Sequence, residues 1–475
     1  MSIRKNMISS FTLAISNFIF PIITFPYITR IISNDSIGKV FFVDACTQYF
    51  ITFASFGIPA YAVREIAKIK NLPRQYSQLV SELLIIQVTL SILFSLLFIS
   101  IPIWSSSLHN HKDLIRISCI TIISTSFMMD WFYQAMEKYT FITIRSVVVR
   151  ILGVILILLF VKTSDDYLIY YSIPAVITLI NTGINFGRYL ARHHVASKEN
   201  LKPLRHIKPL LILFAINVSV SVYTVLDTII LGMLTDPVSV SFYSVPLRLV
   251  KMVWAVAASL GIVFVPRIAS FYKASSFDLI NLTLSKSFSI ISLVTLPFAL
   301  FCILLPREIL FTVAGDKYIE AYQAVQILAL LPFIIGVCNV MGTQFLIPSG
   351  NERRILQATV IGLSVSLLLN FFMIPLWGYI GTSMACLASE LVVCLYIFFY
   401  AQKIITLSID YNILFLIFIS ALPVILLKHI LASHFTNQSL LLISGLIYLA
   451  TFVLLQIIYF KNAFLFSIMK IKLTK

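Results

Sequence analysis

Charged side chains are scarce in this sequence: Asp, Glu, Lys and Arg make up 11% of its 475 residues, against about 25% in an ordinary soluble domain. Hydrophobic residues make up 59%, which is more than a soluble fold of this length could bury. Apolar stretches of about twenty residues recur from end to end, each long enough to cross a hydrocarbon core of roughly 30 Å as a helix. They lack the alternation of a transmembrane β-barrel. The composition therefore predicts an all-α polytopic membrane protein.

Motifs of soluble enzymes are also missing. The sequence contains no Walker loop, no Gly-x-Gly-x-x-Gly and no Gly-x-Ser-x-Gly, and it has no soluble region large enough for an ATPase. The six cysteines all fall in apolar segments, which argues against a disulfide framework. The seven histidines lie in or beside predicted loops without the spacing of metal ligands, so we expect no metal and no cofactor.

A membrane glycosyltransferase or polymerase is the alternative from a different class. Such an enzyme would be expected to carry a long outer loop or an acidic cluster at the interface. The predicted outer loops are all short, the largest lying around Arg307 to Glu320. We therefore expect a transporter and not an enzyme.

The basic residues give the chain an orientation. We count about fourteen spans between residues 8 and 460, and Lys and Arg collect on the cytoplasmic side of membrane proteins. With the N-terminus inside, 25 of the 35 basic residues fall on the cytoplasmic side, 8 on the outer side and 2 within a span. The charge is spread over many short loops, which argues against nucleic-acid binding. We expect a multi-pass membrane protein with both termini in the cytoplasm.

A weak internal repeat divides the chain. Ser55-Phe56-Gly57-Ile58 is followed by Arg64 near the end of the second span, and Ser259-Leu260-Gly261-Ile262 by Arg267 near the end of the eighth. The longest internal cytoplasmic segment, Arg188 to Lys208, falls between spans six and seven. We expect two pseudo-symmetric six-helix lobes, as in transporters built from repeats. The predicted parts are residues 1–200 (spans 1–6), 201–405 (spans 7–12) and 406–475 (two additional spans and a tail).

Polar side chains inside the spans are the candidate functional residues, because they are costly in a bilayer and normally face a wet cavity or a partner. Span seven carries a polar stripe at helical spacing, and two other spans carry an acid and a glutamine four residues apart. The predicted polar lining is Asn217, Ser221, Thr224, Thr228, Gln48, Asp130 and Gln134. The predicted ion-coupling carboxylates are Asp227, Asp44 and Glu390.

Basic residues inside or beside the spans suit an anionic substrate, and a diphosphate would qualify. The predicted diphosphate ligands are Arg30, Arg248, Lys251, Lys39 and Arg145. Two structural alternatives stay open. Arg248, Lys251 and Asp227 could form ion pairs that only hold the bundle together, and Arg30 and Lys39 could merely anchor the interface by snorkelling.

Several motifs, taken together and in order, resemble those of one family. The first half carries Phe25-Pro26-Tyr27-Ile28-Thr29-Arg30, Gly38, Gly57-Ile58-Pro59, Arg64-Glu65-Ile66-Ala67 and the run from Asp130 to Lys138 followed by Ile144-Arg145. The second half carries Tyr223 to Asp227, Leu231-Gly232, Tyr243, Gly342 to Pro348, Asn370, Pro375, Gly378, Gly381 and Glu390. This pattern resembles the Wzx-type polysaccharide flippases of the multidrug/oligosaccharidyl-lipid/polysaccharide (MOP) exporter superfamily.

The resemblance implies a two-lobed bundle that passes an undecaprenyl-diphosphate-linked oligosaccharide, such as an O-antigen repeat unit, to the outer leaflet by alternating access. It also implies a location in the bacterial inner membrane. Because the chain has no ATPase, we expect the cycle either to couple to an H⁺ or Na⁺ gradient or to be driven by removal of product. A polysaccharide polymerase and chain-length proteins are the expected partners, and nucleic acid is not. The first outer turn departs from the family, which often has Gly where this chain has Asn34 to Ser36. A peptidoglycan-precursor flippase or a multidrug exporter of the same superfamily remains the alternative.

Overall fold

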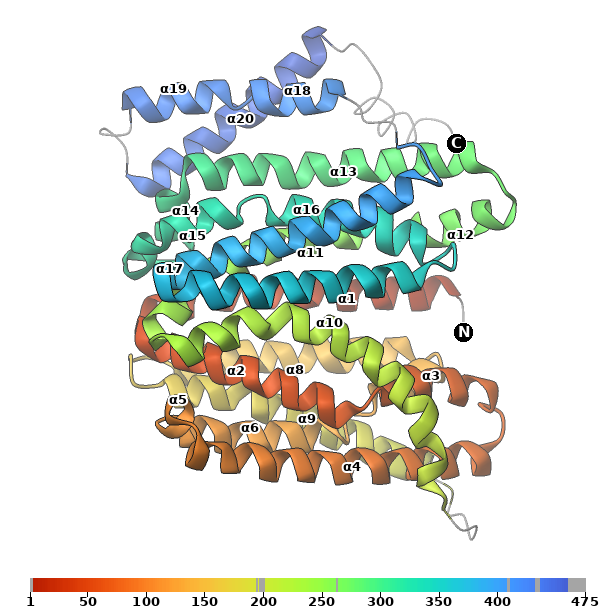
Figure 1. The fold of residues 1–475 in the computed structure, drawn as a ribbon. Coiled ribbons are helices and arrows are strands. Elements are labelled where there is room, and N and C mark those ends of the chain that lie inside the picture. The colour runs from red at the N-terminus through yellow and green to blue at the C-terminus, as the bar shows by residue number, and fades with distance from the viewer. Residues whose placement is uncertain are drawn as a thin grey trace. The chain divides into compact units, whose positions relative to one another are not determined.

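The computed structural model describes residues 3–193, 195, 201–261, 264–407, 411–431 and 436–459. All regular secondary structure in these ranges is helical, which confirms the all-α prediction (Figure 1). Ten helical segments of the described chain are long and apolar enough to cross a membrane. They are Asn34–Lys68, Pro73–Trp104, Lys112–Ala135, Tyr139–Phe160, Tyr167–Arg192, Phe277–Leu304, Asp316–Leu346, Glu352–Gln402, Tyr411–His429 and Asn437–Leu455.

Three further long helices, α1 (Ile3–Ile31), α10 (Ile207–Leu234) and α11 (Pro237–Gly261), coincide with the remaining predicted spans. The segment Glu352–Gln402 covers two predicted spans and has a non-helical residue, Gly378, near its middle. The total of fourteen spans stays a prediction.

The chain forms two compact units. Unit 1 comprises residues 1–245 and 359–386, and unit 2 comprises residues 246–358 and 387–475. The units are defined by which residues pack together, and not by an internal repeat. They therefore do not test the predicted lobes of residues 1–200 and 201–405, which stay a prediction.

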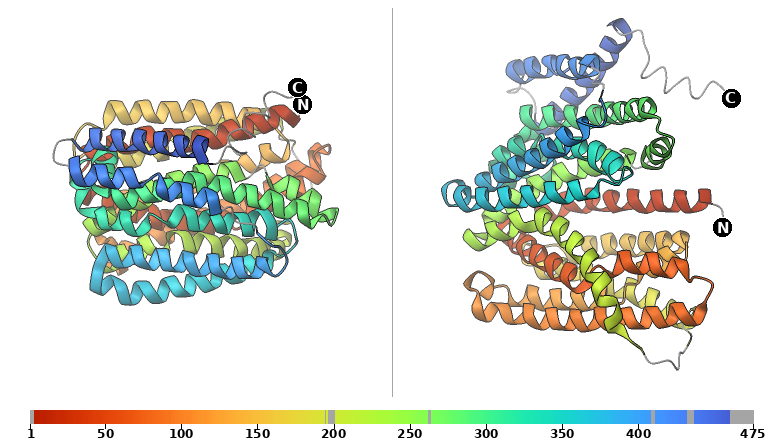
Figure 2. Two further views of the ribbon diagram at one scale, coloured as in Figure 1. Left: turned by 90° about the horizontal axis from the view of Figure 1, so that it is seen from above. Right: turned by 45° about the vertical axis from the view of Figure 1, so that its right-hand side comes forward.

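Unit 1 is built from long helices that pack side by side, with α2 against α4, α6 and α10, and α8 against α1 and α9 (Figures 1 and 2). Besides α1, α10 and the start of α11, its elements are α2 (Asn34–Ser55), α3 (Ile58–Lys68), α4 (Pro73–Trp104), α5 (Ser106–His109), α6 (Lys112–Thr125), α7 (Asp130–Ala135), α8 (Tyr139–Phe160), α9 (Tyr167–Arg192), η1 (Pro203–His206) and the middle of α17 (Glu352–Gln402). Large apolar side chains on α4 are exposed, such as Leu96 (63%) and Ile103 (81%). This outer surface suits lipid as its solvent.

The second predicted span is interrupted where α2 meets α3. Phe56 and Gly57 both have positive φ, at 46° and 75°. A Cβ on Gly57 would lie 2.8 Å from the backbone nitrogen of Phe214 and 3.1 Å from the carbonyl oxygen of Leu210, both on α10. Glycine is required here because the backbone turns in the left-handed region and α10 approaches closely. The break redirects α3, which carries Arg64.

The fourth predicted span is also interrupted, between α6 and α7. Met129 has a φ of 48°, and the freed carbonyls are satisfied by the neighbouring helix α9, since Thr182 Oγ1 donates to the Ser124 oxygen over 2.9 Å and Asn185 Nδ2 donates to the Met128 oxygen. Non-helical backbone at membrane depth needs such partners. Asp130 and Gln134, the acid and glutamine predicted on this span, lie four residues apart on α7, and the helix does not continue to Lys138. Helix α7 ends at Ala135, and Lys138 precedes α8.

Unit 2 is organised around α13, which packs against α16 and α18. Its other elements are the rest of α11 and of α17, α12 (Val265–Lys273), α13 (Phe277–Leu304), α14 (Pro306–Ala314), η3 (Asp316–Ala321), α15 (Tyr322–Leu328), α16 (Leu331–Met341), η4 (Gly342–Leu346), α18 (Tyr411–Ile419), α19 (Leu422–Leu431) and α20 (Asn437–Tyr459). Phe288, Ile334, Val337 and Cys394 form one buried apolar cluster in this unit. Cys394 therefore packs as a small hydrophobic residue.

Candidate functional site

Asp227, on α10, is the centre of a buried polar cluster in unit 1. Its side chain accepts hydrogen bonds from Ser366 Oγ (2.6 Å) and Asn370 Nδ2 (2.7 Å) on Oδ1, and from the Tyr243 hydroxyl (3.3 Å) on Oδ2. All four residues are buried. Ser366 and Asn370 are one helical turn apart on α17, so they present their polar groups to the same carboxylate.

The Asp227 cluster contains an unused oxygen. Asn370 Oδ1 is buried and has no hydrogen-bond partner, whereas the amide nitrogen of Asn370 is fully engaged with Asp227 and Ser366. A carboxylate beside a buried amide oxygen and a hydroxyl is a set of hard oxygen ligands, which is the kind of group that binds a hard cation. In the described residues, no group of three or more His, Cys, Asp or Glu side chains could hold a metal ion. A cation at Asp227 would therefore rely on neutral oxygens for its other ligands.

Only part of the polar stripe predicted around Asp227 has side chains among the described residues. Thr228 follows Asp227 and is buried. The side chains of Asn217, Ser221 and Thr224 lie outside the described residues, although their backbone belongs to α10. Their predicted place in a polar lining stays a prediction.

Two other predicted site residues, Asp130 and Arg145, form an ion pair with each other. Arg145 Nη1 and Nη2 donate to Asp130 Oδ1 (2.8 Å) and Oδ2 (3.2 Å), and Asn185 Nδ2 donates to Oδ1 over 2.8 Å. The Arg145 side chain is 3% exposed. This two-pronged geometry is the strong form of an arginine–carboxylate contact. It gives Arg145 a structural role, and its predicted contact with a diphosphate stays a prediction.

Two predicted ligands, Arg30 and Lys39, lie on either side of the first predicted outer turn. Arg30, at the end of α1, is exposed, and its Nη1 donates to the Pro26 oxygen over 3.2 Å. Lys39 pairs with Asp35 one turn earlier on α2, at 2.5 Å. Exposed pairs of this kind contribute little to stability.

The other predicted site residues are spread over both units. On α2, Asp44 is half-buried and Gln48 is exposed, and on α7 Gln134 is half-buried. Arg248 and Lys251 on α11 and Glu390 on α17 are half-buried and belong to unit 2. The structure thus joins Asp130 with Arg145, and it surrounds Asp227 with residues from α11 and α17.

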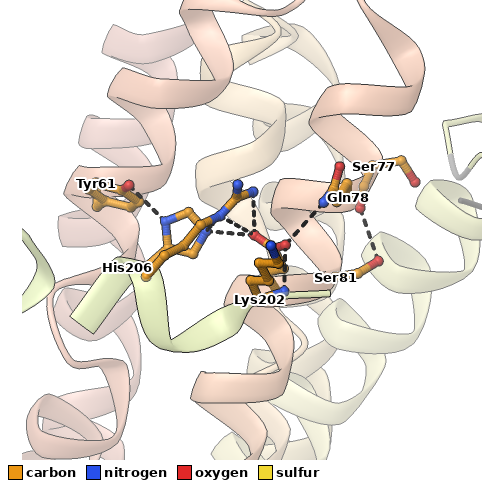
Figure 3. Close-up of polar contacts among 8 residues, drawn as sticks. Tyr61, Ser77, Gln78, Ser81, Lys202 and His206 are labelled. Atoms are coloured by element: carbon orange, nitrogen blue, oxygen red, sulfur yellow. Dashed lines mark hydrogen bonds and ion pairs between the residues drawn. The ribbon is translucent and has the colours of Figure 1, made fainter. Parts of the chain in front are cut away.

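The sequence analysis did not single out a second buried carboxylate, Glu82 on α4, whose side chain is fully buried. Its Oε1 accepts from Gln78 Nε2 (3.2 Å) and from the backbone nitrogen of Lys202 (2.9 Å). Its Oε2 accepts from Arg205 Nη2 (2.7 Å) and His206 Nε2 (2.7 Å), and the other ring nitrogen of His206 accepts from the Tyr61 hydroxyl (2.8 Å) (Figure 3). We call Tyr61, Gln78, Glu82, Lys202, Arg205 and His206 the linker clamp.

The linker clamp fastens the segment that precedes α10 to α3 and α4 (Figure 3). A second contact lies nearby, where Ser77 Oγ accepts from the backbone nitrogen of Val195 (3.1 Å) and donates to its oxygen (3.0 Å). In the sequence, the only local sign of the linker clamp is a single acid, Glu82, in the apolar run of α4. Gln78 is four residues from Glu82, but the other partners, Lys202, Arg205 and His206, lie at least 120 residues further along the chain.

Comparisons with known proteins agree with this architecture. The family model described as "Polysaccharide biosynthesis protein" matches residues 3–272, and the model described as "MatE" matches residues 213–372. A curated relative from Escherichia coli (strain K12), named "Putative O-antigen transporter", is 25% identical over 83% of this chain and 95% of its own length. A relative of the same name from Shigella dysenteriae is 22% identical over 83% of this chain and 98% of its own length.

A solved structure titled "Lipid II flippase MurJ, inward closed conformation" shares the fold. It has a TM-score of 0.73 and 14% identity, and the match covers 96% of this chain and 98% of that one. These relatives are named as transporters and flippases, not as enzymes. The chain belongs to the polysaccharide biosynthesis protein family and is a multi-pass bacterial membrane transporter.

Proposed function

We propose that this chain moves an undecaprenyl-diphosphate-linked oligosaccharide, an O-antigen or similar surface polysaccharide repeat unit, from the inner to the outer leaflet of the cytoplasmic membrane by alternating access. The observation that carries the proposal is the match, over 83% of the chain, to two relatives named for O-antigen transport. The basic residues of the spans support an anionic lipid-linked substrate. The proposed orientation has both termini in the cytoplasm, and a polysaccharide polymerase and chain-length proteins are the proposed partners.

The proposed contacts to the diphosphate are Arg30, Lys39, Arg145, Arg248 and Lys251. Arginine's planar fork matches a phosphate group better than the point charge of lysine. We therefore expect Arg248→Lys to impair transport more than Arg353→Lys, because Arg353 is exposed at the start of α17. Complementation of polysaccharide display in a flippase-null strain, at matched protein level, measures the difference. Full complementation by Arg248→Ala would exclude Arg248 as a ligand.

The proposed energy source is a cation gradient coupled through Asp227, with Asp44 and Glu390 as the next candidates. One cation moving inward gains about 2.3 kcal/mol per 100 mV of membrane potential. The buried carboxylate and the unused amide oxygen of Asn370 support Asp227 as the coupling residue. Either H⁺ or Na⁺ fits this chemistry.

A peptidoglycan-precursor flippase is the second candidate, favoured by the TM-score of 0.73 to the Lipid II flippase. Multidrug export is supported less well, since its cationic substrates would favour an acidic site. A membrane glycosyltransferase or polymerase has no support among the relatives' names. Expression in two strains, one lacking its polysaccharide flippase and one depleted of its lipid II flippase, separates the two leading candidates. Rescue of surface polysaccharide alone supports the proposal, and rescue of growth alone overturns it.

A further inference from the structure

A cluster of basic and aromatic side chains lies where α7, α8 and α9 end or begin in unit 1. The rings of Phe132 and Tyr133 contact the His193 ring, with centroids 5.3 and 6.4 Å apart, and the Phe141 ring lies 4.8 Å from that of Tyr133. Arg188 stacks its guanidinium on Phe141, with Cζ 4.1 Å from the ring centroid. Phe132 and Tyr133 are fully buried, so they form an aromatic core beneath the basic groups, whereas Phe141 is partly exposed beside them.

The positive charges of this cluster lack acidic partners. In the part of the chain that the structure describes, no ion pair joins Lys138, Arg188 or Arg192 to a carboxylate. The nearby acids are engaged elsewhere, since Glu137 pairs with Lys70 and Asp130 pairs with Arg145. Arg188 Nε is buried without a hydrogen-bond partner. Three cations are therefore gathered without described counter-charges.

Burial and the neighbouring positive charges lower the pKa of two members of the cluster, Lys138 and His193. Partial burial and the charges of Arg188 and Arg192 lower the pKa of Lys138. Burial, Lys138 and the two arginines lower the pKa of His193 to about 4. The neutral imidazole then accepts a hydrogen bond from Lys138 Nζ over 2.8 Å.

Local helix structure accounts for only one of these cations. Arg192 lies in the last turn of α9, where the helix macrodipole stabilises positive charge. Lys138 is in the opposite situation, because it is the N-cap residue of the 22-residue helix α8. A helix N-terminus disfavours a cation and favours an anion. A bound anion would compensate both Lys138 and the helix end.

The cluster lies at the ends of three candidate membrane spans, which finish at Ala135, begin at Tyr139 and finish at Arg192. Side chains at such positions meet lipid head groups, and basic pockets between membrane helices bind anionic ones. The partly exposed Phe141 ring, on which Arg188 stacks, adds an apolar contact at the same interface.

We propose that Lys138, Arg188 and Arg192 bind the phosphate of an anionic lipid head group beside the partly exposed ring of Phe141. The site shares no residue with the proposed contacts to the transported diphosphate, although Arg145 and its partner Asp130 lie close to it. Its ligand is a resident membrane lipid such as phosphatidylglycerol, which would fix the ends of α7, α8 and α9 at the interface.

The test is native mass spectrometry of the purified full-length protein with phosphatidylglycerol or phosphatidylcholine. Each basic residue near a membrane surface contributes about fivefold to anionic-lipid binding, so Lys138→Gln/Arg192→Gln should weaken retention of phosphatidylglycerol roughly 25-fold. The matched control Arg64→Gln/Lys68→Gln also removes two positive charges, but these residues already pair with Glu65. It should retain the lipid within about twofold.

Equal loss in the test and control variants would overturn the proposal. Arg188→Lys keeps the charge but loses the planar stack on Phe141, so it should still weaken retention even if the double variant fails to fold. A second arm adds inorganic phosphate without lipid. Displacement of phosphatidylglycerol by inorganic phosphate at comparable concentration would overturn the lipid assignment, and retention of the lipid supports it.

Discussion

Glu82 and Asp227 are both buried carboxylates of unit 1, and they differ in the groups that hold them. Glu82 accepts from the side chains of Arg205 and His206 and from a backbone nitrogen. The contacts to Asp227 from Ser366, Asn370 and Tyr243 come from neutral groups, and a buried amide oxygen lies beside them. An acid held by a cation from a neighbouring segment fastens that segment. An acid that accepts hydrogen bonds from neutral groups can exchange those contacts for a proton or a metal cation.

The largest expected effect on stability is that of Glu82→Ala. This change leaves His206 and the Lys202 backbone nitrogen without their acceptor, and losing one partner of a buried pair costs about 3–5 kcal/mol. Because Arg205 is 51% exposed and water can solvate it, we expect the lower end, about 3 kcal/mol. Denaturant unfolding of the purified protein in detergent measures the loss.

Glu65→Ala is the control, because Glu65 forms ion pairs with Arg64 and Lys68 at a more exposed position. It should cost less than about 1 kcal/mol. Equal losses for the two variants would show that the linker clamp contributes no more than a surface pair.

The spans could be predicted from the sequence because hydropathy is a local property. The helix breaks at Phe56–Gly57 and before Asp130 could not, since they depend on the approach of α10 and on donors from α9. Asp227 was recognisable as a polar residue inside a span, but Ser366 lies 139 residues further along the chain. The pairing of Arg145 with Asp130 could not be predicted, because it crosses a helix break and leaves no periodic signal.

A smaller effect is expected from Ser366→Ala, and it concerns coupling. The change removes the 2.6 Å contact to Asp227, and hydrogen bonds to charged groups contribute about 1.5–3 kcal/mol. We expect the cation concentration for half-maximal transport to change about tenfold. The matched control is Ser383→Ala on the same helix, which is also buried but donates to the Tyr379 oxygen. An equal change in both variants would show that the contact of Ser366 with Asp227 has no specific part in coupling.

The smallest effect is expected from Tyr61→Phe in the linker clamp. It leaves His206 Nδ1 without its donor and should lower the free energy of unfolding by about 1 kcal/mol. In the Glu82→Ala background the same change should cost less, because His206 is no longer held. A double-mutant cycle measures this coupling. Strict additivity would mean that Tyr61 and Glu82 act independently.

Transfer of a labelled lipid-linked oligosaccharide across vesicles, with and without imposed H⁺ and Na⁺ gradients, tests the account most directly. Wild-type protein should transfer the substrate faster with one of the two gradients, and Asp227→Asn should abolish that acceleration. Glu82→Gln, which alters the buried carboxylate of the linker clamp, should keep it. Transfer by wild-type protein that is unchanged when both gradients are collapsed would contradict the account, as would an Asp227→Asn variant that responds like the wild type.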